Sequence, residues 1–133
     1  MADYAVKRIE EMEAVYAGAF KRARAELGVN SFGLSVMDIP PNFEQYPEHD
    51  HSGDGQEEVY VALRGSAEVE IDGERHPLDP ETIVRVSAGT NRKIWPGGEG
   101  VRILAIGGCP DKLYEAPASS ELGAPDPLTQ ARA

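Results

Sequence analysis

The chain has 133 residues and a formal net charge of −10 at pH 7, with 41% hydrophobic and 27% charged residues. This length suits a single domain with one core. The excess of negative charge argues against nucleic acid or an anionic membrane as a partner, because both would repel the protein.

Cysteine content and hydropathy bear on the compartment. The single cysteine, Cys109, excludes an intrachain disulfide. The sequence has neither the apolar N-terminal segment of a secretory signal nor the long apolar run of a membrane span. We therefore expect a cytoplasmic protein. We do not expect Cys109 to be a nucleophile, since reactivity requires an activated thiol.

Residues 1–30 are predicted to form a helical segment that packs on the domain after it. Apolar residues recur every three or four positions, which predicts one helix between about Ile9 and Leu27, with Gly28 as its C-terminal cap. Gly18 is expected to weaken this helix. One face would carry a basic cluster, which we interpret as solvated surface in preference to an anion-binding face. Its members are Lys21, Arg22 and Arg24.

Residues 31–109 carry short strand patterns separated by turns. Strands are predicted over residues 32–39, 57–63, 67–71, 82–86 and 101–107. Apolar and acidic residues alternate in the third of these, so its apolar residues should face the core. Asp72-Gly73 predicts a hairpin turn, and residues 96–100 predict another turn. Short strands at this spacing, with no helices between them, indicate an antiparallel sandwich or barrel.

The last part, residues 110–133, is rich in proline and shows no periodicity. Its four prolines are incompatible with a regular sheet ladder or a helix interior. Leu113, Tyr114 and Leu122 are predicted to anchor this tail to the barrel. From Asp126 onward the chain is expected to fray.

Two histidines and a glutamate form the most informative pattern in the chain. His49 and His51 are two residues apart, so in a strand both imidazoles point to the same face. Glu58 lies at the start of the next apolar run. Two imidazoles and one carboxylate are a donor set that suits zinc, iron, manganese or nickel. We therefore predict that any bound divalent ion is held by His49, His51 and Glu58.

This pattern resembles the first motif of the cupin superfamily, in which two histidines and a glutamate precede a glycine, here Gly65. Residues 78–92 are similar to the second cupin motif, with its acidic turn, strand and Gly-Thr turn. The resemblance covers roughly residues 31–108. It implies an all-β fold: an antiparallel cupin-type β-barrel (jelly roll) over residues 31–109, with an N-terminal helix and an irregular C-terminal tail.

The chain departs from the cupin pattern at two places. Residues 52–55 lengthen the gap between the second histidine and the glutamate. Arg92 stands where the second motif normally supplies a third histidine, and a guanidinium cannot ligate a metal. Two arrangements remain open. Either Arg92 pairs with Glu58 and no metal binds, or a metal binds with waters completing its shell while Arg92 turns to an anionic ligand.

Neighbouring residues extend the predicted site. By alternation along its strand, Tyr60 should bring its hydroxyl into the pocket, so Arg92 and Tyr60 are the predicted ligand-binding residues. Asp54 or Glu57 could supply a further oxygen to a metal, and Gln56 could offer a neutral carbonyl. No catalytic residue is assigned.

The resemblance favours a cupin that binds a small anionic molecule in its barrel, with or without a divalent metal. Two alternatives stay open: a metal-dependent isomerase, epimerase or dioxygenase, and a structural dimer with a vestigial pocket. We also expect a homodimer. Open sheet edges tend to be paired, and residues 101–106 are apolar on both faces.

Overall fold

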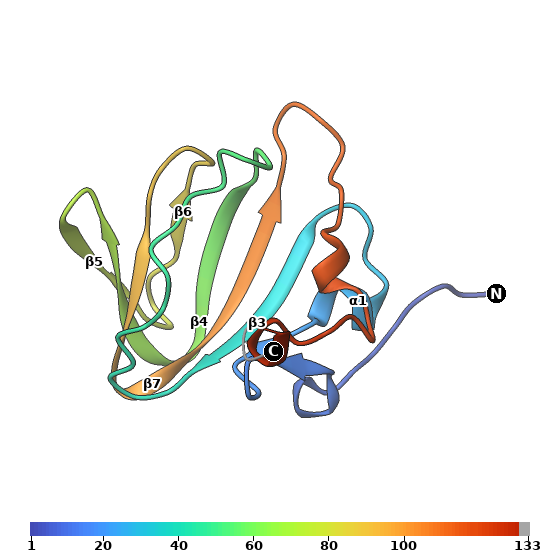
Figure 1. Cartoon of the computed structure of the whole chain (residues 1–133), viewed down its shortest axis with the longest axis horizontal. Coiled ribbons are helices and arrows are strands. Elements are labelled where there is room, and N and C mark those ends of the chain that lie inside the picture. The colour runs from blue at the N-terminus through green and yellow to red at the C-terminus, as the bar shows by residue number, and fades with distance from the viewer. Residues whose placement is uncertain (131–133) are drawn as a thin grey trace.

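One antiparallel sheet of seven strands dominates the computed structural model, which describes residues 1–130. The strands are β1 (Ala14–Val15), β2 (Phe20–Lys21), β3 (Gly33–Ile39), β4 (Glu57–Ile71), β5 (Glu74–Leu78), β6 (Val84–Val86) and β7 (Lys93–Gly108). They pair in the order β1-β2-β3-β7-β4-β5, and β6 pairs with β4. Figure 1 shows the curved sheet, with β5 and β6 at one side and both terminal segments gathered at the other. The predicted all-β, antiparallel architecture is confirmed.

The two long strands, β4 and β7, form the centre of the sheet and bend together. Their pairing extends from Glu57–Gly108 to Glu70–Lys93, with register shifts between residues 62 and 67. At the bend Gly65 has a φ of +74°, and a Cβ there would overlap the carbonyl oxygen of Gly100. Only glycine tolerates both the conformation and the close approach. The strands predicted at 57–63 and 67–71 are therefore two halves of one bent strand.

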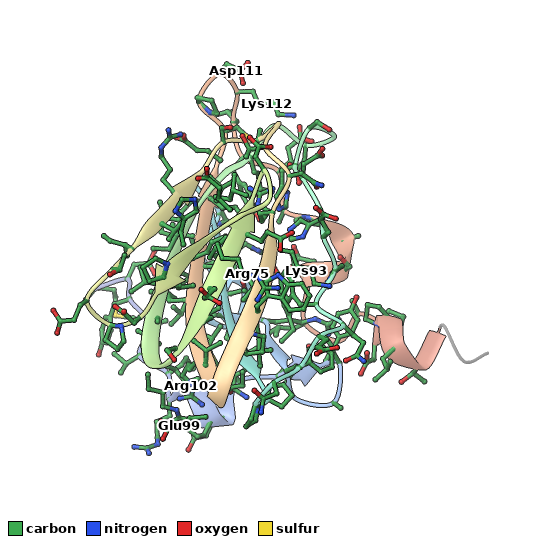
Figure 2. All side chains as sticks on the ribbon, turned by 90° about the vertical axis from the view of Figure 1, so that its left-hand side faces the viewer. Arg75, Lys93, Glu99, Arg102, Asp111 and Lys112 are labelled. Atoms are coloured by element: carbon green, nitrogen blue, oxygen red, sulfur yellow. The ribbon has the colours of Figure 1, made fainter. Side chains whose placement is uncertain are left out.

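Residues 96–100, predicted as a turn, lie inside β7 instead. Pro96 pairs with Ala67 just beyond a register shift. Gly100 has a φ of +74°, where a side chain would meet the Ile39 carbonyl oxygen. These glycines and the proline accompany irregularities in the ladder, which the strand tolerates without ending. Glu99 and Arg102 mark this end of the molecule in Figure 2.

The inner face of the sheet carries the main core. Buried side chains alternate along β4 and β7: Tyr60, Ala62, Ala67 and Val69, then Ile94, Ile103 and Ala105. The predicted inward direction of the apolar residues in 67–71 is confirmed, because Ile71 also packs against this core. The predicted hairpin at Asp72-Gly73 is confirmed too. Both residues have a positive φ, which is typical of the two-residue turn that joins β4 to β5.

The N-terminal segment differs from its prediction as one helix between Ile9 and Leu27. It holds a 3₁₀ turn η1 (Ile9–Glu11), the β1–β2 hairpin and a short helix α1 (Ala23–Leu27). Gly18, with a φ of +90°, lies in the hairpin turn, and Gly28 caps α1 as predicted. Met12 and Ala23 pack against Val36 of β3. Packing on the sheet therefore outweighs the weak helical preference of these residues.

The C-terminal tail is held by polar contacts rather than by its leucines. Leu113 and Leu122 are exposed, so their predicted anchoring is wrong, whereas Tyr114 is partly buried. The tail contains η2 (Ala118–Ser120) and α2 (Pro127–Gln130). The Asp126 carboxylate accepts a hydrogen bond from the Tyr16 backbone at 3.2 Å, so the fraying expected from Asp126 is wrong as far as residue 130. Residues 131–133 lie outside the described part.

The helices of residues 1–130 are all too short or too polar to cross a membrane.

Candidate metal centre and its cavity

Two histidines and a glutamate meet on the inner side of the sheet. His49 and Arg92 exchange backbone hydrogen bonds of 3.0 and 2.9 Å, and the His51 backbone donates to the Ala88 carbonyl at 2.7 Å. These contacts fix the histidine loop against the segment that precedes β7. Glu58 comes from the start of β4. The ligand atoms of His49, His51 and Glu58 all lie within 4.8 Å of one another.

Each imidazole is oriented by an oxygen on its far side. The Nδ1 of His49 lies 3.0 Å from the Pro47 carbonyl oxygen, and the Nδ1 of His51 lies 3.0 Å from an Asp54 carboxylate oxygen. Both oxygens are acceptors, so each Nδ1 carries the proton. The Nε2 of each ring is then the atom that can coordinate a cation, and at His51 a cation would displace the proton that Nε2 shares with Glu58, 3.0 Å away. Such oriented imidazoles are typical of protein metal sites.

Asp54 is itself held in place. One of its oxygens accepts a hydrogen bond from the Gln56 backbone at 3.1 Å, and the other accepts one from the Gln56 side chain at 3.3 Å. The loop of residues 52–55, which lengthens the cupin pattern, thus provides the carboxylate that orients His51. Asp54 lies behind the imidazole, where it supports a ligand.

The Glu58 carboxylate is the electrostatic centre of the site. Its Oε1 lies 3.0 Å from His51 Nε2 and 3.6 Å from an Arg92 nitrogen, and it accepts a hydrogen bond from Tyr60 at 2.8 Å. Burial acts to raise the pKa of Glu58, but His51, Tyr60 and Arg92 outweigh it and lower that pKa. Glu58 is therefore ionised at neutral pH, as a metal ligand must be.

Arg92 is fully buried and lies beside Glu58, as the arrangement in which these two residues pair requires. Its guanidinium lies within ion-pair distance of Glu58, and 3.5 Å from the carbonyl oxygens of His49 and Ser87. Its Nε finds no hydrogen-bond partner in residues 1–130. The predicted position of Arg92 in the barrel beside Glu58 is confirmed. Its role as a ligand contact stays a prediction.

A cavity of about 230 Å³ opens beside the three donors. His49, His51 and Glu58 line it, together with Tyr46, Asp54 and Gln56. Within residues 1–130, Tyr60 and Arg92 stand behind this wall and do not line it. Burial above all raises the pKa of the Tyr60 hydroxyl, so the phenol stays protonated and donates to Glu58.

One residue suggested as a further metal ligand, Glu57, turns away from the centre. The Glu57 side chain is exposed and pairs with Arg85 at 3.4 Å, so the suggestion that it supplies a metal ligand is wrong. Cys109 donates to the Asp54 carbonyl oxygen at 3.4 Å and is a free cysteine.

The far side of the cavity comes from segments that the sequence motifs do not include. Arg22 and Arg24 line it from the N-terminal segment, and Tyr114 lines it from the tail. Both arginines are buried, with 2% and 5% of their surface exposed, so their interpretation as solvated helix surface is wrong. Their spacing gave no signal, because residues two apart do not share a face of a helix.

Comparisons with known proteins agree with this fold. The family model described as a cupin domain matches residues 35–107. This is more than half of the chain, and the protein therefore belongs to the cupin family. The search of curated proteins gives no match.

Solved structures show the same fold. A cupin protein from Bacteroides fragilis is 20% identical, with a TM-score of 0.66 over 88% of this chain and 93% of that one. A predicted oxalate decarboxylase from Thermotoga maritima is 21% identical, with a TM-score of 0.52 over 59% of this chain and 68% of that one. KdgF from Halomonas sp. is 15% identical, with a TM-score of 0.51 over 62% and 74%. At these identities the likeness establishes the fold alone.

Proposed function

We propose that this cupin holds a divalent metal ion at His49, His51 and Glu58 and binds a small anionic molecule in the cavity beside them. The observation that carries the proposal is the pair of oriented imidazoles, each of which has a ring nitrogen within 4.8 Å of the other and of a Glu58 carboxylate oxygen. Two nitrogens and one oxygen suit zinc, iron, manganese or nickel. Arg92 takes no part in coordination, because a guanidinium has no free lone pair.

The arrangement also supports a second candidate, a metal-dependent enzyme. Three protein ligands leave coordination positions for water or substrate, as catalytic metal sites require. A bound metal would supply Lewis-acid activation or an acidified water. Tyr60 would hold Glu58 in place through its hydroxyl, and Asp54 would hold His51. No residue beyond these is assigned a catalytic role.

Elemental analysis of protein purified without a histidine tag tests the proposal. We expect about one equivalent of metal per chain, and a loss of at least tenfold in His49→Ala, because a site with three ligands has little redundancy. His76→Ala is the matched control, since His76 lies on β5 away from the centre and is largely exposed. Equal metal content in the two variants, or an ion bound without either His49 or His51, would refute the site.

We also propose that the chain forms a homodimer through the outer face of β4. Val59 and Val61 are partly exposed there and Leu63 is 43% exposed, opposite the buried Tyr60 and Ala62. The N-terminal segment covers the neighbouring Val36 on β3. Light scattering at micromolar concentration should give twice the monomer mass, and Val61→Lys should lower it. A monomer mass for the wild-type protein would contradict the dimer.

A further inference from the structure

The end of the cavity opposite the histidines is built from two buried arginines. Arg22 precedes α1 and Arg24 lies within it, and both line the same cavity as His49, His51 and Glu58. Buried arginines are rare unless they are paired, so their partners decide what they do.

The partners of both arginines leave part of each guanidinium unused. Arg22 donates to Glu13 at 2.7 Å and to the Pro125 carbonyl oxygen at 3.3 Å. Arg24 donates to the Val29 carbonyl oxygen at 2.8 Å and to Glu121 at 2.7 Å, with Ser120 at 3.4 Å. The Nε of each arginine is buried and finds no acceptor in residues 1–130. Each guanidinium therefore keeps donor capacity that the protein itself does not use.

Tyr114 lines the cavity together with both arginines and both histidines. Burial raises the pKa of its hydroxyl, Arg24 acts to lower it, and Asp54 acts to raise it. A side chain at Gly33 would press on the Tyr114 hydroxyl, and one at Gly107 would overlap the Gln56 amide. These two paired glycines leave the room that the Tyr114 and Gln56 side chains occupy beside the cavity.

Charge and size restrict the ligand. Two arginines and two carboxylates, Asp54 and Glu58, line the cavity and balance one another. Glu13 and Glu121 pair with the arginines from outside this lining, and the divalent ion of the proposed function, on which this step rests, would add two positive charges to the cavity. The volume of about 230 Å³ is smaller than the roughly 300–1,000 Å³ of pockets for drug-sized ligands. A small dianion would match both the charge and the space.

We propose that Arg22 and Arg24 form an anion subsite, which binds a carboxylate group of a small dicarboxylate whose other end reaches the metal centre. The side chains of Glu13 and Glu121 are 37% and 57% exposed. These glutamates hold the arginines from the solvent side, and terminal nitrogens with a second N–H remain on side chains that line the cavity. Arginine suits this task because its planar fork matches a carboxylate.

The experiment measures malonate binding to zinc-loaded and to metal-free protein, by calorimetry and by the shift in unfolding temperature. Malonamide, a neutral molecule of similar shape, is the control ligand. We expect malonate to bind and malonamide not to bind. Arg24→Lys should weaken malonate about tenfold, because lysine keeps the charge and loses the fork. Arg75→Lys, on the outer face beside Lys93 (Figure 2), should leave malonate binding unchanged.

A second variant separates a ligand subsite from a purely structural clamp on the tail. Glu121→Gln removes a competing carboxylate from Arg24 and should strengthen malonate binding about threefold. A clamp would instead lower the unfolding temperature of Glu121→Gln and leave malonate affinity as in the wild type. This outcome for Glu121→Gln would overturn the subsite. So would failure of malonate to bind, or binding of malonamide as tight as that of malonate.

The same measurements in His49→Ala distinguish this proposal from the proposed metal site. Malonate binding that persists in metal-free His49→Ala and responds to Arg24→Lys supports the subsite even if the wild-type protein carries no metal. If metal content is normal and neither Arg24→Lys nor Glu121→Gln changes malonate affinity, the subsite is refuted. The proposed metal site is then still supported.

Discussion

Arg102 and Arg92 are both buried arginines in one small barrel, yet their surroundings differ in how completely each is paired. Arg102 directs Nε and one terminal nitrogen to Asp38 at 2.7 and 3.1 Å, and the other terminal nitrogen to Glu10 at 2.9 Å. Arg92 has one carboxylate at 3.6 Å, two carbonyl oxygens at 3.5 Å and an Nε without an acceptor in residues 1–130. Burial alone therefore does not identify a structural arginine. An arginine whose N–H groups all have close acceptors is structural, and Arg102 meets this criterion. Arg92 does not, because part of its hydrogen-bonding capacity remains unused.

Removing Arg102 should give the largest change, and it should be a change in stability. Arg102→Met leaves Asp38 with Lys21 as its remaining partner, at 3.3 Å. We expect the free energy of unfolding to fall by about 2–3 kcal/mol, because charged hydrogen bonds are lost at a buried position. Urea denaturation measures this loss. Metal content should stay as in the wild type.

Arg75→Met is the matched control for Arg102. Arg75 is 44% exposed, lies 4.2 Å over the Trp95 ring and makes long ion pairs to Glu68 and Glu70. Its loss should cost less than about 1 kcal/mol. Equal destabilisation by the two variants would contradict the distinction between complete and loose pairing.

Replacing Asp54, whose carboxylate orients His51, should have the next largest effect, and this effect should be on metal binding. Asp54→Asn preserves size but weakens the acceptor behind His51 Nδ1. We expect zinc affinity to fall about ten- to a hundredfold, as for other residues that orient metal ligands. Titration against a competing chelator measures it. Glu57→Gln, which alters an exposed carboxylate paired with Arg85, should have no effect on affinity. If zinc affinity fell as much in Glu57→Gln as in Asp54→Asn, the cause would be a general effect of charge and not the orientation of His51.

Replacing Arg92 tests the second arginine directly. Arg92→His removes a cation 3.6 Å from Glu58 and places an imidazole where cupins normally have a third histidine. We expect zinc affinity to rise about tenfold, with a smaller rise in Arg92→Met, which removes the charge without adding a ligand. Circular dichroism should confirm that both variants fold. Unchanged zinc affinity in both would mean that Arg92 does not act on the centre.

The sequence predicted the parts of this molecule that depend on local pattern. The period-two alternation in residues 67–71 and the Asp72-Gly73 turn are local, and both were predicted correctly. The spacing of His49, His51 and Glu58 predicted a cluster that the fold does bring together.

What the sequence did not predict depends on tertiary packing. The helix expected from Ile9 to Leu27 is replaced by a hairpin and a short helix, because β2 pairs with β3 and Met12 packs on Val36. Arg22 and Arg24 look like solvated cations until the tail covers them with Glu121 and the Pro125 carbonyl. A contact between residues about a hundred positions apart leaves no trace in local periodicity.

The metal centre around His51 and the ion pair of Arg102 with Asp38 should also differ in how their contributions to stability change with pH. Glu58 above all, and then Asp54, raise the pKa of His51, while burial acts to lower it. Protonated His51 therefore stabilises the metal-free fold below its ordinary pKa of about 6.5, and this contribution is lost as pH rises through the raised value. Around Arg102, burial acts to raise the pKa of Asp38, but Arg102 lowers it. That contribution is present above the ordinary pKa of Asp and is lost only in acid.

Between pH 6 and 8.5, we expect the unfolding free energy of metal-free protein to fall by less than about 1 kcal/mol, since His51 is partly exposed. This is the smallest effect that we predict. His51→Gln should remove the fall, whereas Arg102→Met should retain it. Zinc should reverse its sign in the wild type, because the metal requires the neutral imidazole and binds more tightly as pH rises. The same fall in His51→Gln would mean that another group titrates, and the proton on His51 would then not compete with a metal.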